Sequence, residues 1–169
     1  MPAARRSRRR TAPVTAVAAL MLTACGDAPV VPEFAADSWP DGTPIDVDEL
    51  RGSPVLLAGW ATWCVPCERE LPMLDAFADT ETSEGIEIVA VNVDRADVSD
   101  ADLASMLDRL DVDLPVWRDV DQSFLASYEG AMMPYSVLLD RDGAVADTWT
   151  GSLDTDGDDF LAAIADVSG

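Results

Sequence analysis

The feature that most constrains the fold is a continuous apolar run at 55–61, VLLAGWA, which leads almost directly into two cysteines. A run of this length without a polar interruption is typical of a β-strand that is buried on both faces. Cys64 and Cys67 follow, and in the next stretch Leu71, Leu74 and Phe77 are spaced for one face of a helix. The sequence therefore predicts a buried strand that runs into a helix, with both thiols at the junction.

The rest of the chain continues this alternation. We expect strands at 86–94, 115–119, 135–140 and 144–150, and helices at 65–78, 99–110, 121–130 and 157–167. Ser99 is the predicted N-cap of the second helix, and Asp121 and Gly130 are predicted to cap and end the third. Asp41-Gly42 predicts a hairpin turn ahead of the first long strand. This order predicts an α/β fold with a mixed central sheet that is covered by helices on both faces.

The charge is strongly acidic, with 32 Asp and Glu against 11 basic residues and a formal net charge of −21. Such a surface repels phosphate backbones, so we expect no nucleic-acid partner. The excess charge fits a soluble surface adapted to a salty medium, or an acidic docking face for a basic partner. The apolar content of 49% is enough for a core that does not depend on disulfide staples, and we expect a monomer.

The N-terminus has the order of an export signal. A basic stretch ends at Arg10, an apolar run follows, and small residues lead to Cys25. The ending Leu22-Thr23-Ala24-Cys25 resembles a bacterial lipobox, which implies acylation of Cys25 and anchoring on the outer face of the cell membrane. An ordinary cleaved signal with an incidental cysteine is the alternative, and the choice between general and twin-arginine export stays open. We therefore expect a lipoprotein-type signal peptide at 1–24, a membrane-proximal tether at 25–32 and one domain at 33–169.

Two thiols three positions apart allow four interpretations. A structural zinc site needs four ligands, and the chain has no second cysteine pair and no histidine, so we expect no metal. A copper chaperone would need a histidine beside its thiols, and this chain has none. A purely structural disulfide would close a very short loop, which constrains the unfolded chain least. Redox exchange is the remaining interpretation, and it needs no cofactor.

The position of Cys64 and Cys67 supports redox exchange. A cysteine at a helix N-terminus faces unpaired backbone N–H groups and the positive end of the helix dipole, which stabilise the thiolate. We expect Cys64 to be the exposed nucleophile and Cys67, one turn later, to resolve the mixed disulfide. The nearby carboxylates of Glu68 and Glu70 disfavour a thiolate by like-charge repulsion. The sequence thus predicts a reducing dithiol, one that donates electrons.

The segment VLLAGWATWCVPCERELPML resembles the active-site segment of TlpA/ResA-like thiol–disulfide oxidoreductases, a thioredoxin-like group related to the AhpC/TSA–redoxin proteins. The resemblance extends to LRGSPVLL before it and to AMMPYSVLLDRDGAV after it, and it covers about residues 33–167. It implies a thioredoxin fold with a mixed central sheet flanked by helices and an N-terminal β-hairpin extension. One departure is Ala58, where thioredoxin carries a buried Asp.

The resemblance also implies roles for individual residues. Cys64 would attack and Cys67 would resolve, the two forming the redox disulfide, and Glu70 would be the proton partner. The substrate-binding residues would be Trp63, Met133, Tyr135 and the cis-proline Pro134. The alternatives are a solvated Glu70, a packing role for Trp63 and a trans turn at Pro134.

The function implied is an extracytoplasmic, membrane-anchored reductase of protein disulfides, in this family usually for cytochrome c maturation. Its partners would be a disulfide-bearing protein such as apocytochrome c and a membrane thiol carrier that supplies electrons. The alternatives are a general extracytoplasmic oxidoreductase or isomerase, and a redox-sensing or binding lipoprotein without enzymatic activity.

Overall fold

The computed structural model describes residues 32, 34–83 and 85–169. The predictions on the signal peptide at 1–24, on Cys25 and on nearly all of the tether lie outside the described residues. Within the described part, no helix has the length and apolar character needed to cross a membrane.

In the described residues, a seven-stranded mixed sheet forms the centre of the domain, in the order β2-β1-β5-β4-β3-β6-β7. The strands are β1 (Asp37–Trp39), β2 (Thr43–Pro44), β3 (Val55–Trp60), β4 (Glu87–Asn92), β5 (Val116–Arg118), β6 (Tyr135–Leu139) and β7 (Val145–Thr150). β3 pairs in parallel with β4 and antiparallel with β6. Every residue of β3 is buried, as the unbroken apolar run predicts.

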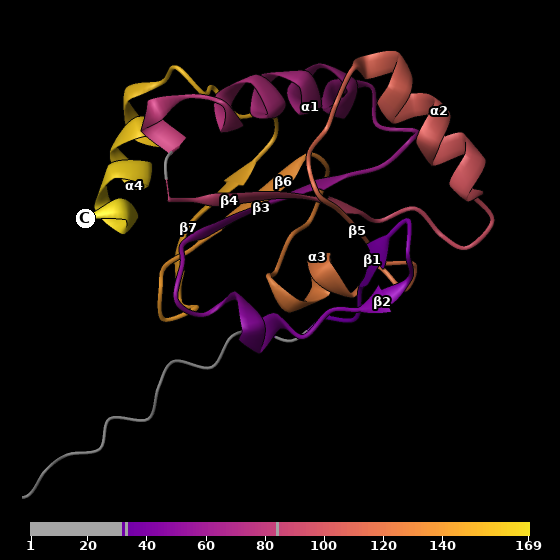
Figure 1. Ribbon diagram of the computed structural model, residues 1–169, viewed down its shortest axis with the longest axis horizontal. Helices are drawn as coiled ribbons and strands as arrows, with labels where there is room; N and C mark the ends of the chain where they lie inside the picture. Colours follow the sequence, from indigo (N-terminus) through magenta and orange to yellow (C-terminus); the bar gives the residue numbers. More distant parts are fainter. Residues whose placement is uncertain (1–31, 33, 84) are drawn as a thin grey trace, which may run out of the picture.

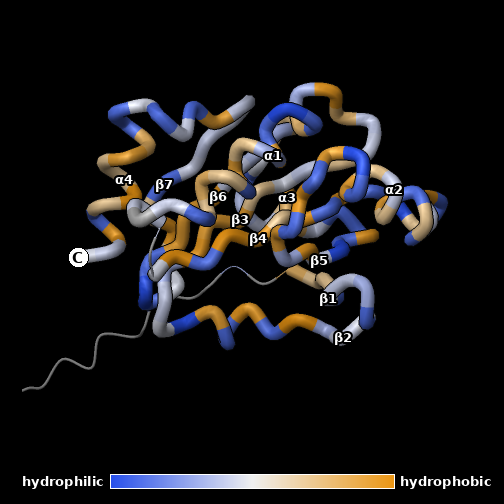
Figure 2. The backbone as a smooth tube through the Cα atoms, turned by 45° about the horizontal axis from the view of Figure 1, so that its top comes forward, coloured by the Kyte–Doolittle hydropathy of each residue, from blue (hydrophilic) through white to orange (hydrophobic). Residues whose placement is uncertain are grey.

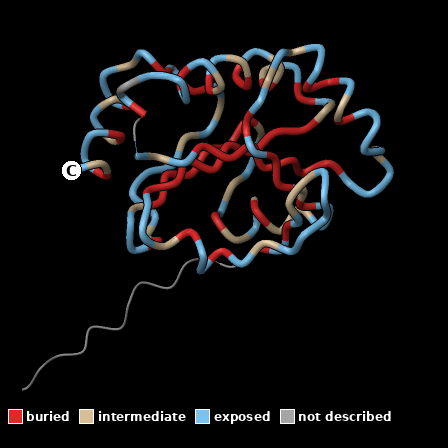
Figure 3. The backbone as a smooth tube through the Cα atoms, in the orientation of Figure 1, coloured by how far each residue is buried: buried red, intermediate tan, exposed pale blue. Residues whose placement is uncertain are grey.

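Four α-helices cover the sheet: α1 (Val65–Ala78), α2 (Asp100–Leu110), α3 (Ser123–Ser127) and α4 (Asp158–Ser168). Figure 1 shows α1, α2 and α4 along one face of the sheet and α3 on the other. This arrangement confirms the predicted mixed sheet with helices on both faces. Hydrophobic residues concentrate along the central strands (Figure 2), and the same strands are the most continuously buried part of the chain (Figure 3).

The core has one aromatic cluster on each face of the sheet. On the α1 side, the ring of Phe160 from α4 packs edge-on against Phe77 of α1, with centroids 5.2 Å apart. On the α3 side, the rings of Phe34, Phe124 and Tyr128 pack together with centroid distances of 5.4 to 6.0 Å. The two clusters hold the helices against the central sheet, in which β3 leads to the cysteines.

The N-terminal hairpin is present as predicted. β1 and β2 pair antiparallel around a turn that contains Asp41 and Gly42, and β1 also pairs with β5. A 3-10 turn at Val47–Leu50 (η1) then leads the chain to β3, and a second 3-10 turn at Glu81–Ser83 (η2) follows α1. The hairpin thus extends the sheet beyond β5.

Two predicted caps have different outcomes. Ser99 caps α2 through a complete capping box with Asp102, which confirms the sequence prediction. Asp121 does not cap α3: the N-cap is Gln122, and the side chain of buried Asp119 accepts from the backbone N–H groups of Ser123 and Phe124 at 3.0 and 2.7 Å. The prediction of Asp121 was wrong because a carboxylate that follows β5 is already buried beside the start of α3 and satisfies these donors first.

Candidate active site

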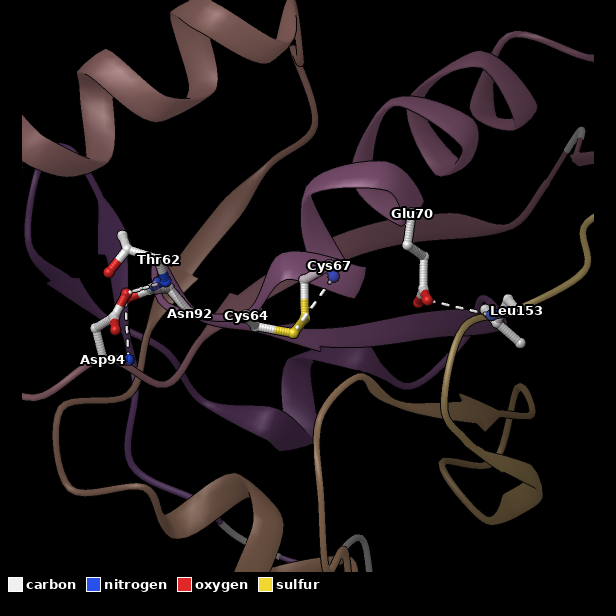
Figure 4. Close-up of a disulfide and its surroundings, with 7 residues drawn as sticks. All are labelled: Thr62, Cys64, Cys67, Glu70, Asn92, Asp94 and Leu153. Carbon is white, nitrogen blue, oxygen red and sulfur yellow. Dashed lines mark hydrogen bonds between the residues drawn. A yellow bond between two sulfur atoms is a disulfide. The ribbon is translucent and has the colours of Figure 1, made fainter.

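The two cysteines lie where β3 passes into α1, and they are joined by a disulfide (Figure 4). Cys64 is the N-cap of α1, and its Sγ accepts from the backbone N–H of Cys67 at 3.3 Å. Its own N–H donates to the carbonyl of Ala61 at 3.0 Å, which closes a tight turn ahead of the helix. Pro66 falls in the first helical turn, where its missing N–H leaves no helical bond unmade. The sequence therefore builds a rigid helix start around the sulfur atoms.

Cys64 is not exposed, contrary to the sequence prediction. It is 3% exposed, and Cys67 is 1% exposed. The reason is the direction of the side chain: as the N-cap, the Cys64 Sγ turns toward the first turn of α1, where it meets both the Cys67 N–H and the Cys67 Sγ. Both cysteines are therefore almost completely shielded from solvent.

Glu70 lies one turn after Cys67 on α1 and is buried, with only 4% of its surface exposed. Its Oε2 accepts from the backbone N–H of Leu153 at 3.1 Å. Burial raises the pKa of Glu70 from 4.5 to about 7, although the Leu153 N–H and the hydroxyls of Ser152 and Ser136 pull the pKa back down. A solvated Glu70 is therefore excluded, and its carboxyl group can gain or lose a proton near neutral pH.

Ser136 in β6 is a buried polar residue beside this carboxyl group that sequence analysis missed. It pairs in register with Ala58 of β3, and its hydroxyl interacts with the Glu70 carboxyl group and favours the ionised form. The sequence carried a signal for it, since Ser136 interrupts the apolar strand directly after Pro134 and Tyr135.

A second buried carboxylate, Asp94, lies on the other side of the disulfide from Glu70 (Figure 4). Its Oδ2 accepts from the backbone N–H of Thr62 at 2.7 Å and from the Nδ2 of Asn92 at 2.9 Å. Sequence analysis missed this group as well. The signal was the pair of polar residues that ends the otherwise apolar strand at 86–94.

The peptide bond between Met133 and Pro134 is cis, as the resemblance implies, so the trans alternative is excluded. Met133 is partly buried against the core, and its Cε lies 3.3 Å from the point where a Cβ on Gly59 would stand. Tyr135 is buried: its ring packs against Phe124 and its hydroxyl donates to the carbonyl oxygen of Tyr128 at 2.6 Å. Packing and this hydrogen bond direct the Tyr135 ring into the core, and the role of Tyr135 in substrate binding stays a prediction.

Exposed apolar side chains lie next to Cys64 and next to Met133 in the sequence. Trp63, directly before Cys64, is 63% exposed, and Val65 and Met132 are exposed too. Trp63 therefore does not have the core packing role considered as its alternative. No group of three or more Cys, Asp or Glu side chains in the described part of the chain is arranged to hold a metal ion.

Comparisons with known proteins agree with this site. Residues 26–164 match the family model described as Redoxin. The thiol-disulfide oxidoreductase ResA of Bacillus subtilis (strain 168) is 31% identical over 122 residues, which are 72% of this chain and 66% of that protein. ResA of Bacillus thuringiensis (strain Al Hakam) is 31% identical over 111 residues, 66% of this chain and 62% of that protein. The matched region thus spans a little under two thirds of these relatives.

Solved structures share the fold. A candidate thiol:disulfide interchange protein DsbE from Chlorobium tepidum superposes with a TM-score of 0.70 at 27% identity, covering 82% of this chain and 95% of that one. The pneumococcal exposed lipoprotein thioredoxin Etrx1, from Streptococcus pneumoniae strain TIGR4, gives a TM-score of 0.65 at 26% identity and covers 79% of this chain and 98% of that one. The predicted thioredoxin-like fold is confirmed.

Proposed function

Because the chain belongs to the redoxin family, we propose that it is a thiol–disulfide oxidoreductase that reduces protein disulfides through Cys64 and Cys67. One observation carries the proposal: the two sulfur atoms form a disulfide at the first turn of α1, with Cys64 as the N-cap. A thiolate at this position is stabilised by the helix N-terminus and is the reactive form of a cysteine.

The reaction proceeds in two exchanges. The Cys64 thiolate attacks one sulfur of the client disulfide, so a mixed disulfide forms and a client thiolate leaves. The thiolate of Cys67 then attacks the Cys64 Sγ, which restores the Cys64–Cys67 disulfide and releases the second client thiolate. Two electrons pass to the client disulfide, and the two client thiolates take up the two protons that the cysteine pair has lost.

Glu70 is the proposed proton partner of Cys67. It lies three residues after Cys67 on the same helix, and burial places its pKa at about 7. A carboxylate with this pKa can take the proton of the Cys67 thiol before the second exchange and release it afterwards.

The proposed substrate face consists of the exposed ring of Trp63 and the loop of Met133 and Pro134. An extended client segment beside the disulfide would pair with the backbone of Met133, as in recognition by strand addition. The exposed apolar rim at Trp63, Val65 and Met132 favours a client whose cysteine lies among apolar residues.

We also propose that the chain acts outside the cytoplasm as a lipoprotein with a signal peptide at 1–24, a lipid on Cys25, a tether at 25–32 and a domain at 33–169. The order of the N-terminal sequence supports this, and one structural relative is described as an exposed lipoprotein. A membrane thiol carrier would return the two electrons by reducing the Cys64–Cys67 disulfide. Apocytochrome c, whose haem-attachment cysteines must be reduced, is the proposed client.

Disulfide reduction in insulin, with dithiothreitol as electron source, tests the activity of the full chain. We expect the wild-type protein to accelerate the reaction and Cys64→Ser to abolish it. Cys67→Ser should accumulate mixed disulfides, and the protein trapped in cells identifies the client. Cys25→Ser is the matched control, because it should lose membrane association while keeping insulin reduction. A wild-type chain that never exchanges its disulfide would refute the proposed activity.

A further inference from the structure

Asp94 is a buried carboxylate that the exchange chemistry above does not use. It is 1% exposed and stands two residues after the end of β4. Its backbone N–H is held by the Oδ1 of Asn92 at 3.3 Å, and its Oδ2 accepts from two donors. Two donors on one oxygen suit an anionic acceptor. Among the described residues, its Oδ1 is buried without a hydrogen-bond partner.

The donor that matters for the dithiol is the backbone N–H of Thr62. This residue belongs to the short segment between β3 and α1, two positions before Cys64. The Thr62 bond anchors the beginning of this segment to the end of β4, and the turn from Cys64 N–H to the Ala61 carbonyl fixes its end. Asp94 therefore ties the segment that carries the N-cap cysteine to the end of β4.

The charge of Asp94 has no counterion in the described structure. None of the ion pairs among the described residues includes it, and the neighbouring Arg95 donates to Gln122. Glu68 is different, because Arg109 pairs with it at 3.2 Å and offsets its charge. Asp94 is thus a buried carboxylate without an ion pair to any described residue that is hydrogen-bonded to the segment before Cys64, and its field is little screened by water.

We propose that Asp94 is a positioning residue that fixes the Cys64 segment through the Thr62 N–H and that its buried negative charge makes the dithiol reducing. The proposal rests on the proposed exchange function. A buried negative charge on the residue that anchors the Cys64 segment opposes the Cys64 thiolate, which exists in the dithiol and not in the disulfide. Removing the charge stabilises the reduced protein and makes the couple more oxidising.

Equilibration of the full chain with glutathione near pH 8 measures this effect. In this equilibrium, one protein disulfide and two glutathione thiols yield one protein dithiol and one glutathione disulfide, so two electrons move. In Asp94→Asn, the side-chain oxygen can still accept from Thr62 and Asn92 while the charge is gone. We expect its equilibrium constant to shift about tenfold toward the dithiol, which corresponds to about 30 mV. Asp94→Ser, a second neutral variant, should shift the constant in the same direction.

Asp94→Ala separates positioning from charge. It removes the acceptor of the Thr62 N–H as well, so we expect insulin reduction at least tenfold slower than in Asp94→Asn. Asp119→Asn is the matched control, because Asp119 is equally buried but binds the start of α3 instead. It should lower thermal stability and leave the glutathione equilibrium within about twofold of wild type.

These measurements distinguish a failure of the Asp94 inference from a failure of the proposed function. If the wild type equilibrates with glutathione while Asp94→Asn and Asp94→Ser keep the wild-type constant, the inference is wrong and the proposed function stands. An equal shift in Asp119→Asn would overturn the inference too, since it would reflect a general loss of buried charge. A wild type that does not equilibrate at all would remove the proposed function and this inference with it.

Discussion

Glu70 of α1 accepts a hydrogen bond from the backbone N–H of Leu153, with Oε2 and N 3.1 Å apart, across 83 positions of sequence. The bond joins the helix that carries Cys67 to the loop between β7 and α4. Burial of the carboxyl group raises the pKa of Glu70 to about 7, although the Leu153 N–H favours the ionised form, and this raised pKa makes the stability of the oxidised protein depend on pH.

Glu70→Gln should remove that dependence. The pKa of Glu70 is raised in the folded protein, so its stabilising contribution is complete below the unfolded value of 4.5 and is lost as the pH rises to about 7. Relative to Glu70→Gln, we expect the wild type to lose about 2 kcal/mol of unfolding free energy between about pH 5 and pH 8. Urea denaturation of the oxidised forms at both pH values measures the difference. Glu68→Gln is the control and should follow the wild type; a parallel course for Glu70→Gln would contradict the prediction.

Asp119→Ala should destabilise the protein by about 2–4 kcal/mol. The variant leaves the backbone N–H groups of Ser123 and Phe124 without their acceptor at the buried start of α3. Asp121→Ala, two positions later and exposed, should change stability by less than about 0.5 kcal/mol. Thermal unfolding of both variants provides the comparison, and equal losses would restore Asp121 as the cap.

Gly59→Ala should cost about 1–3 kcal/mol because the added methyl group has no room. Its Cβ would lie 2.9 Å from the backbone oxygen of Tyr135 and 2.8 Å from a ring carbon of Phe124. Gly169→Ala is the control, since its Cβ would meet only the Ala165 oxygen at 3.8 Å. Denaturant midpoints that are unchanged in both variants would show that β3 and β6 can separate freely at this point.

Removal of the Tyr135 hydroxyl should lower stability, whereas removal of the Tyr128 hydroxyl should not. Tyr135→Phe removes the donor to the Tyr128 carbonyl oxygen and should destabilise by about 1 kcal/mol. Tyr128→Phe removes a buried hydroxyl that has no partner among the described residues, so the variant should be as stable as the wild type or more so. Calorimetric unfolding of the two variants tests this ordering, and a larger loss for Tyr128→Phe would reverse it.

Sequence patterns predicted the elements that depend on local periodicity. The unbroken apolar run became β3, and the spacing of Leu103, Met106 and Leu107 became the buried face of α2. Predicted ends differ from the observed ones by one or two residues at most strands and helices. The exception is α3, which is half as long as the predicted 121–130. It starts after Gln122, beside the buried Asp119, and it ends at Ser127, before Glu129 takes a left-handed φ of 57°.

The chemical environment of the dithiol could not be read from local pattern. The burial of Glu70 depends on Leu153 in a distant loop, and the anchoring of Thr62 depends on Asp94, 32 positions later. Exposure of Cys64 was wrongly predicted for the same reason: helix position indicates which atoms stabilise a thiolate, but tertiary packing decides how much of the sulfur reaches solvent.

The burial of the two cysteines restricts which client disulfides can reach them. Cys64 and Cys67 are 3% and 1% exposed and the Trp63 side chain stands exposed beside them, so a disulfide flush with the surface of a compact protein meets more steric hindrance to in-line attack than one on a projecting segment. We expect the clients to be chains that project a disulfide on a mobile segment, such as newly exported polypeptides before they fold. Recessed cysteines would thus protect finished proteins from being reduced by mistake.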